Sequence, residues 1–131
     1  MKALHHIEFW VSDLEQESAS WGWVLELLGW TVDQNWEGGV SWRAVDVYIV
    51  LTTAPALTGD AHDRRRPGVN HLALWAPSRA AVDAITATAP NHGWQALYSD
   101  RYPHAGGPEH YAAYLESASG FKLEIVADFA G

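Results

Sequence analysis

Two short segments of the chain, about 65 residues apart, repeat a pattern of histidine, apolar residues and tryptophan. They are His6–Trp10 (HIEFW) and His71–Trp75 (HLALW). Near the other end of the chain, Glu124 stands among apolar residues, where an ionised carboxylate is costly unless it is paired or bound to a cation. Two imidazoles at equivalent positions of a repeat, together with this carboxylate, form a candidate functional site.

Further residues of the same strands are expected to line this site. Because side chains alternate between the two faces of a strand, Glu8 and Trp10 share a face with His6, and Trp75 shares one with His71. Glu8 is either a partner of a ligand or an acid that lines the pocket. His5 is expected to point to the opposite face and to have a structural role.

The repeat also predicts the secondary structure of each half. Ser12 and Glu15 have the spacing of a capping box, which predicts a helix starting at Asp13, and Gly29 is a suitable residue to end it. A second helix is expected to begin near Ser78. Short strands are expected at 31–35, 40–43 and 45–52 in the first half, and at 95–99, 111–116 and 121–127 in the second.

Each half is therefore a predicted βαβββ module, and the fold class is α+β. We expect one domain over residues 1–131, with module one at about 3–54, a linker at about 55–68 and module two at about 69–128. The linker is rich in proline, glycine and charge, and its run Arg64, Arg65 and Arg66 is expected to be a solvated loop.

Composition excludes several classes of protein. The 131 residues are 48% hydrophobic, which excludes a disordered chain, and the absence of cysteine excludes a disulfide framework and a thiol nucleophile. A net charge of −8 disfavours nucleic acid and anionic membranes as partners, and no apolar run is long enough to span a bilayer. A cytoplasmic protein is expected. Eight tryptophans in so short a chain suggest that some of them line a cleft.

Several of these segments together resemble a known family. The segments 4–14 (LHHIEFWVSDL), 27–30 (LLGW), 70–74 (NHLAL) and 119–124 (SGFKLE) resemble the vicinal oxygen chelate superfamily, which includes glyoxalases, extradiol dioxygenases and bleomycin-resistance proteins. The resemblance covers nearly the whole chain. It implies two βαβββ modules that form an eight-stranded, cup-shaped mixed sheet with the helices outside. It also implies a homodimer and a divalent metal ion inside the cup.

The resemblance implies which residues hold the metal. The matching ligand positions are His6, His71 and Glu124. The fourth falls at about Val50, with Tyr48 on the same strand face; neither is a good ligand, and both are expected to contact the substrate. Two imidazoles and one carboxylate leave positions open for substrate oxygens, as in catalytic metal sites. Fe, Mn, Zn, Ni and Co all remain possible identities.

The resemblance to extradiol dioxygenases also indicates acid–base residues. Those enzymes carry a tyrosine ten residues before the glutamate ligand, where Tyr114 stands here, and His104 is one residue away from the spacing of their acid–base histidine. His110 lies in the same proline- and glycine-rich loop. The alternative is a hairpin loop in which these rings only pack.

Two functions follow from these observations. The first is a metal-dependent enzyme of the glyoxalase or dioxygenase type, acting on a small substrate that chelates the metal through vicinal oxygens. The alternative is a non-catalytic protein, similar to bleomycin-resistance proteins, that sequesters an aromatic drug or natural product. Its acidic cleft would be lined by the tryptophans Trp10, Trp36, Trp42 and Trp75.

Overall fold

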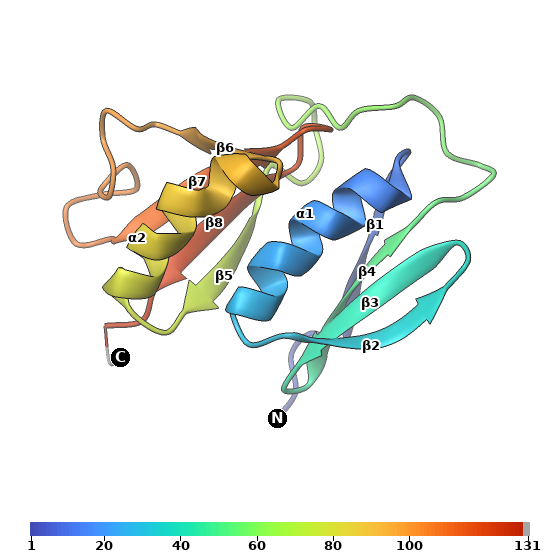
Figure 1. Ribbon diagram of the computed structural model, residues 1–131, viewed down its shortest axis with the longest axis horizontal. Helices are drawn as coiled ribbons and strands as arrows, with labels where there is room; N and C mark the ends of the chain where they lie inside the picture. Colours follow the sequence, from blue (N-terminus) through green and yellow to red (C-terminus); the bar gives the residue numbers. More distant parts are fainter. Residues whose placement is uncertain (130–131) are drawn as a thin grey trace. The chain divides into compact units, whose positions relative to one another are not determined.

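The structure is a computed structural model that describes residues 1–129 (Figure 1). The chain divides into two compact units, the first covering Met1–Ala61 and the second starting at His62. Each unit contains one βαβββ module, which confirms the predicted α+β fold of two repeated modules. The eight strands form two hydrogen-bonded sheets of four strands, one in each unit. No helix among the described residues is long and apolar enough to cross a membrane.

The first unit places its first and last strands side by side. Its strand order is β1-β4-β3-β2, with β1 parallel to β4 and the other neighbours antiparallel. In this register His6 lies opposite Tyr48, and Glu8 lies opposite Val50. The elements are β1 (His6–Trp10), α1 (Leu14–Leu27), β2 (Thr31–Trp36), β3 (Gly39–Ala44) and β4 (Val47–Thr52).

The second unit repeats this topology. Its strand order is β5-β8-β7-β6, so the last strand lies between β5 and β7. Glu124 on β8 is paired with Ala73 on one side and with Tyr114 on the other. The elements are β5 (Leu72–Ala76), α2 (Arg79–Thr88), the 3₁₀ helix η1 (Ala89–His92), β6 (Trp94–Leu97), β7 (Ala112–Ser117) and β8 (Lys122–Ala127).

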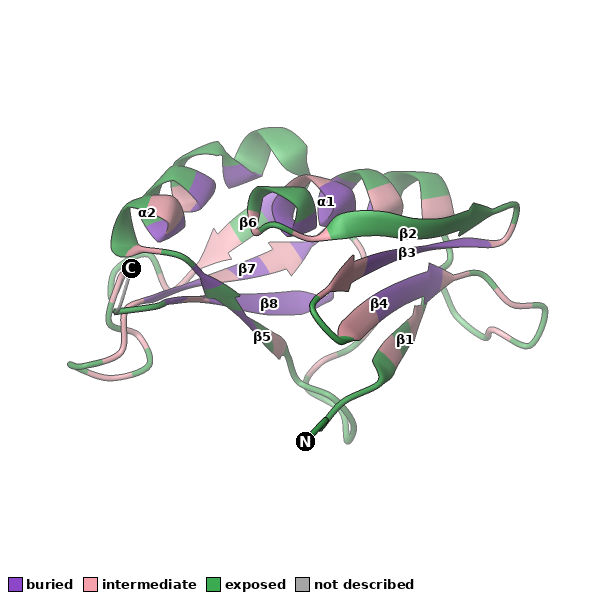
Figure 2. Cartoon of the chain, turned by 90° about the horizontal axis from the view of Figure 1, so that it is seen from below, coloured by how far each residue is buried: buried purple, intermediate pink, exposed green. Residues whose placement is uncertain are grey.

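The core of the second unit lies between α2 and one face of its sheet. Val82 and Ile85 of α2 are buried, as are Leu123 and Ile125 of β8. The opposite face of β8 is buried as well, although it carries the charged residues Lys122 and Glu124. Figure 2 shows β8 as buried over most of its length, whereas β2 of the first unit is exposed throughout. The second unit therefore buries charge on a central strand.

The predicted element boundaries hold within about two residues, with two differences of local origin. The strand β4 begins at Val47 because Val45 has a positive φ of 53° and belongs to the preceding turn. The predicted cap of the first helix is wrong by one residue. The side chain of Asp13, and not that of Ser12, accepts a hydrogen bond from the backbone N–H of Gln16 at 3.0 Å.

The remaining helix ends agree with the sequence. The hydroxyl of Ser12, which does not cap α1, donates to the carbonyl oxygen of Asp60 at 2.8 Å. Gly29 follows the last turn of α1 with φ of 92°, a conformation that glycine adopts without strain. The Ser78 hydroxyl caps α2 by accepting from the N–H of Ala81 at 3.1 Å.

Replacing Asp13 tests the corrected cap. We expect Asp13→Ala to lower the free energy of unfolding by about 1 kcal/mol, because the first turn loses the acceptor for one of its unpaired N–H groups. Ser12→Ala should cost less, since it removes only an exposed hydrogen bond to a loop carbonyl. Urea denaturation of the two variants measures both values. A larger loss for Ser12→Ala than for Asp13→Ala would contradict the assignment.

Candidate active site

The carboxylate of Glu124 is the centre of a polar cluster in the second unit. Its side chain is 9% exposed, and one oxygen, Oε1, lies 3.0 Å from Nε2 of His71. The other oxygen, Oε2, contacts Nε2 of His110. One carboxylate thus joins the central strand β8 to the residue before β5 and to the loop before β7. The structure brings together three of the residues predicted from the sequence.

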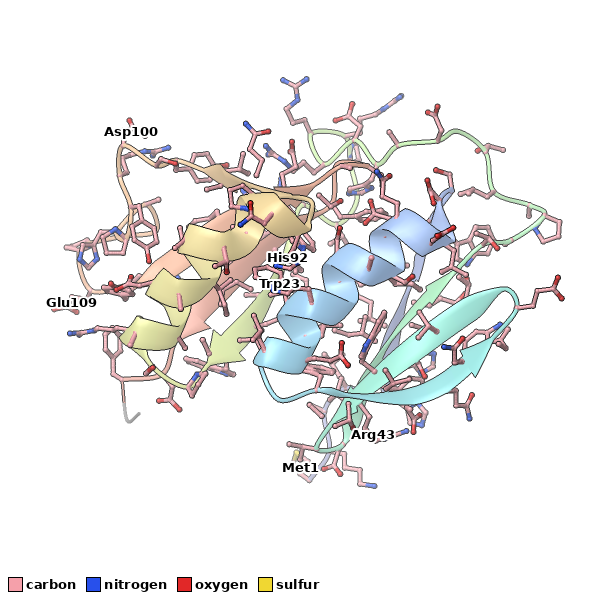
Figure 3. The ribbon with its side chains drawn as sticks, viewed as in Figure 1. Met1, Trp23, Arg43, His92, Asp100 and Glu109 are labelled. Atoms are coloured by element: carbon pink, nitrogen blue, oxygen red, sulfur yellow. The ribbon has the colours of Figure 1, made fainter. Side chains whose placement is uncertain are left out.

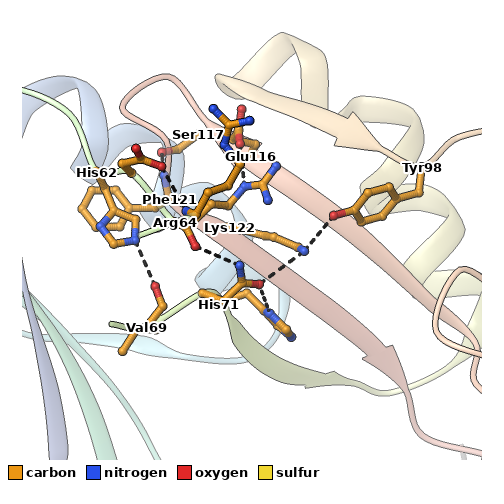
Figure 4. A network of polar contacts seen from close by, with 12 residues as sticks. His62, Arg64, Val69, His71, Tyr98, Glu116, Ser117, Phe121 and Lys122 are labelled. Atoms are coloured by element: carbon orange, nitrogen blue, oxygen red, sulfur yellow. Dashed lines mark hydrogen bonds and ion pairs between the residues drawn. The ribbon is translucent and has the colours of Figure 1, made fainter. Parts of the chain in front are cut away.

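The imidazole of His71 is held in a defined orientation by its neighbour in the sequence. Nδ2 of Asn70 donates to the carbonyl oxygen of Arg64 at 3.0 Å, which leaves Oδ1 as the acceptor for Nδ1 of His71 at 2.7 Å. Since Nδ1 of His71 donates to this oxygen, Nε2 is the ring nitrogen that faces Glu124. Figure 4 shows this network around His71 and Arg64.

His6 occupies the equivalent position in the first unit and is held in a similar way. Its Nδ1 lies 2.8 Å from Nδ1 of His5, and its ring stacks on Tyr48 with centroids 4.7 Å apart. Nε2 is therefore the nitrogen of His6 that remains to bind a ligand. The expectation that His5 points away from His6 is wrong, because β1 begins at His6 and strand alternation does not extend to His5.

The predicted lining residues of the first unit surround a second carboxylate. Glu8 Oε2 accepts from Nε1 of Trp10 at 2.7 Å and lies 3.5 Å from the hydroxyl of Thr52. Val50 is buried, while Trp10 remains 44% exposed. Glu8 therefore orients an exposed indole ring. In the second unit Trp75 is 70% exposed and offers an open aromatic face.

The loop between β6 and β7 carries the predicted acid–base residues; Asp100 and Glu109, labelled in Figure 3, lie on it. His104 is exposed, and its Nδ1 lies 3.2 Å from the carbonyl oxygen of His110, so its ring is not part of the contacts of Glu124. His110 reaches Glu124 instead. A β-carbon on Gly106 would lie 2.6 Å from both the His110 ring and the Tyr114 hydroxyl, so glycine permits this close approach.

Tyr114 lies on β7 directly opposite Glu124. Burial, and secondly the charge of Glu124, raise the pKa of the Tyr114 hydroxyl. Tyr114 is therefore protonated at neutral pH and acts as a hydrogen-bond donor. Its ring contacts that of His71 edge-on, with centroids 6.1 Å apart.

Asp83 on α2 fastens the loop that carries His104 and His110. It accepts hydrogen bonds from the hydroxyls of Tyr102 at 2.5 Å and Tyr111 at 2.6 Å. These hydrogen bonds, that of Tyr102 first, lower the pKa of Asp83. The position of His110 thus depends on a carboxylate on the helix side of the unit.

Comparison with known proteins places this chain in a family. The family model described as the glyoxalase/bleomycin resistance protein/dioxygenase superfamily matches residues 5–114. The chain belongs to this superfamily. An uncharacterized protein of Bacillus subtilis (strain 168), YqjT, is 44% identical over 126 residues, which cover 95% of this chain and 98% of that protein.

Solved structures of the superfamily share the fold of this chain. A candidate glyoxalase from Bacillus halodurans superposes with a TM-score of 0.89 at 40% identity, over 95% of each chain. A glyoxalase/bleomycin resistance protein from Albidiferax ferrireducens T118 has a TM-score of 0.76 at 22% identity, over 95% of this chain and 98% of that one. The second likeness concerns the fold alone.

The superfamily generally binds divalent metal ions, and the donor atoms in the second unit are suited to one. Nε2 of His71 lies 3.0 Å from a carboxylate oxygen of Glu124, and an imidazole nitrogen and a carboxylate oxygen are both common ligands of divalent metal ions. As the side chains stand, however, no group of three or more His, Cys, Asp or Glu residues in the described part of the chain could hold a metal ion by itself. His71 and Glu124 therefore need a further ligand.

Four residues in and around this cluster were not predicted from the sequence. Asn70, Tyr98 and Lys122 join the cluster, and Arg64 binds Glu116 through a hydrogen bond of 2.8 Å. The expectation of a solvated loop is wrong for Arg64, whose side chain is only 20% exposed. Asn70 and Lys122 belong to the segments that carry the family resemblance, so they could have been singled out. No pattern in the sequence distinguishes Arg64 from Arg65 and Arg66.

The pH dependence of the free energy of unfolding should show how much the hydrogen bonds of Asp83 to the loop contribute to stability. Because the folded pKa of Asp83 is lowered, its contribution is fully present above the ordinary pKa of aspartate, about 3.9, and is lost as the pH falls through the lowered value. We expect Asp83→Asn to be less stable than the unmodified protein at neutral pH and to approach it in strong acid. Urea denaturation over a series of pH values measures this convergence.

Asp100→Asn is the matched control for this experiment, since Asp100 is exposed on the same loop. It should retain the pH dependence of the unmodified protein. An Asp83→Asn variant with that same pH dependence would show that the two tyrosine hydroxyls do not favour the ionised carboxylate.

Proposed function

We propose that this chain is a metal-dependent enzyme of the glyoxalase or dioxygenase type that acts on a small molecule carrying vicinal oxygens. A divalent metal ion would be held by Nε2 of His6, Nε2 of His71 and the carboxylate of Glu124. When bound, such an ion acts as a Lewis acid toward oxygens of the substrate. His6 belongs to the first unit, and its participation is part of the proposal.

The orientation of His71 supports this proposal most strongly. Its Nδ1 is hydrogen-bonded to Oδ1 of Asn70, so its Nε2 faces the Glu124 carboxylate. An outer hydrogen bond that fixes the tautomer of a histidine is characteristic of metal ligands. In the first unit His6 also uses Nδ1 for the residue before it, which is His5. Both repeat-equivalent histidines thus keep Nε2 for a ligand.

The remaining residues of the cluster would handle protons. Tyr114, with its raised pKa, would donate a hydrogen bond to a substrate oxygen and stabilise negative charge there. His110, in contact with Glu124 and on a loop beside Tyr114, would accept or deliver a proton at Nε2. His104 is a less direct candidate, since its Nδ1 is occupied by the carbonyl of His110.

The exposed tryptophans support a second candidate function. Trp10 and Trp75 present open indole faces, and Glu8 fixes the first of them by a hydrogen bond. Together with the net charge of −8, these faces suit a protein that sequesters a cationic aromatic compound without reaction. The superfamily typically binds small molecules and often forms dimers, so we include a homodimer in both proposals.

Metal content distinguishes the two functions. Protein purified without chelator or affinity tag should contain about one equivalent of Fe, Mn, Zn, Ni or Co per chain by elemental analysis. His71→Ala should lose the metal because a ligand is removed. Asn70→Ala, which only releases the orientation of His71, should weaken metal binding by about 10- to 100-fold.

His92→Ala is the control, since it removes a histidine at the end of η1 and should retain the metal. Absence of a stoichiometric metal from the unmodified protein, also after incubation with each of the five ions, would overturn the enzyme proposal. Equal metal content in the unmodified protein and in His71→Ala would overturn the ligand assignment.

A further inference from the structure

Lys122 is a buried lysine beside the candidate site. It lies on β8 two residues before Glu124, so both side chains are on the same face of the strand, roughly 6–7 Å apart. The residue is only 8% exposed. A buried ammonium group is costly unless its charge is compensated, so its partners decide whether it has a structural or a functional role.

The partners of Lys122 are all neutral. Its Nζ donates to the hydroxyl of Tyr98 at 2.9 Å and lies 3.5 Å from Oδ1 of Asn70, as Figure 4 shows for Tyr98. It also lies over the rings of Tyr98 and Tyr114, at 4.9 and 5.2 Å from their centroids. No carboxylate among residues 1–129 forms an ion pair with it. Two of its three N–H groups thus have oxygen partners, and neither of these partners is a carboxylate.

The carboxylates nearest to Lys122 along the sheet are already paired. Glu116 is opposite Lys122 in the register of β7 and β8, but Nε of Arg64 holds it at 2.8 Å. Glu124 is engaged by His71 and His110. The buried ammonium group of Lys122 therefore forms no ion pair with a carboxylate of the described residues.

Tyr98 shows that the surroundings of Lys122 favour negative charge on oxygen. The hydrogen bond from Lys122 lowers the pKa of the Tyr98 hydroxyl, although burial acts in the opposite direction. Tyr98 also has a positive φ of 58°, which is uncommon for an aromatic residue. Such backbone conformations persist where the surrounding structure holds them, and they are frequent at functional sites.

We propose that Lys122 binds a carboxylate of the substrate, with the hydroxyl of Tyr98 as a second donor. The inference rests on the proposed function, because it identifies the substrate as a small organic acid. Its vicinal oxygens would lie toward His71 and Glu124, and its carboxylate would lie a few ångströms further along β8. The overall net charge of −8 repels anions, so a local cation is needed to select one.

A pair of matched probes tests this assignment. 3,4-Dihydroxybenzoate carries vicinal oxygens at one end of a ring and a carboxylate at the other, and its methyl ester keeps the ring and the vicinal oxygens but has no negative charge. Calorimetric titration of the unmodified protein should show that the acid binds about 10- to 100-fold more tightly than the ester, as expected for a hydrogen bond between charged groups.

Three variants separate the charge of Lys122 from its packing. Lys122→Met should bind the acid and the ester about equally tightly, with the affinity for the ester unchanged. Its free energy of unfolding should not decrease, because replacing a buried charge by an apolar residue of similar length is often neutral or stabilising. Lys122→Arg should keep the preference. Lys2→Met, which changes the only other lysine and lies in the exposed N-terminal residues, should keep it as well.

The outcomes distinguish this inference from the proposed function when the titrations are made with and without Mn²⁺. A preference for the acid in a protein that binds no metal would overturn the proposed function alone. Metal binding without a preference for the acid, or a preference that Lys122→Met retains, would overturn this inference alone. No detectable binding of the acid at millimolar concentration would overturn it too.

Discussion

The compensation of one buried carboxylate determines the arrangement of the second unit. Glu124 lies on an inner strand of a four-stranded sheet and is only 7% exposed, so water solvates its carboxylate little. A charge in such a place must be paired, and two imidazoles from different loops pair it. Each imidazole is in turn fixed, His71 by Asn70 and His110 by the loop that Asp83 fastens to α2. The geometry of the cluster follows from satisfying Glu124.

The two repeated segments also share a side-chain contact of their histidine. In each unit the histidine before or at the start of the first strand directs Nδ1 to the residue that precedes it, His5 in one unit and Asn70 in the other. The two halves differ in what lies beyond: His6 stacks on Tyr48, whereas His71 meets a carboxylate. The two modules thus hold the histidine ring through similar Nδ1 contacts and differ in what surrounds it.

The fold was predictable from sequence because its signals are local and repeated. The histidine strands, the serine that caps α2 and the glycine after α1 each lie within a few residues of the element that they define. The parts of the site that were missed depend on long-range contacts: Arg64 reaches Glu116 over 52 residues, and Lys122 reaches Tyr98 over 24. His110 was one of three candidates on its loop, and only the folded loop shows that it, and not His104, contacts Glu124.

The strand order of the second unit bears on when its polar cluster can assemble during folding. The final strand enters the sheet between β5 and β7, and it brings both Glu124 and Lys122 with it. His71 and Glu124 are separated by 53 residues, so their meeting requires late, non-local pairing. A growing chain on the ribosome presents β5, α2, η1, β6 and β7 before any of the cluster's buried charges has been made. The histidine and the carboxylate of the cluster therefore come together only once β8 has entered the sheet between β5 and β7.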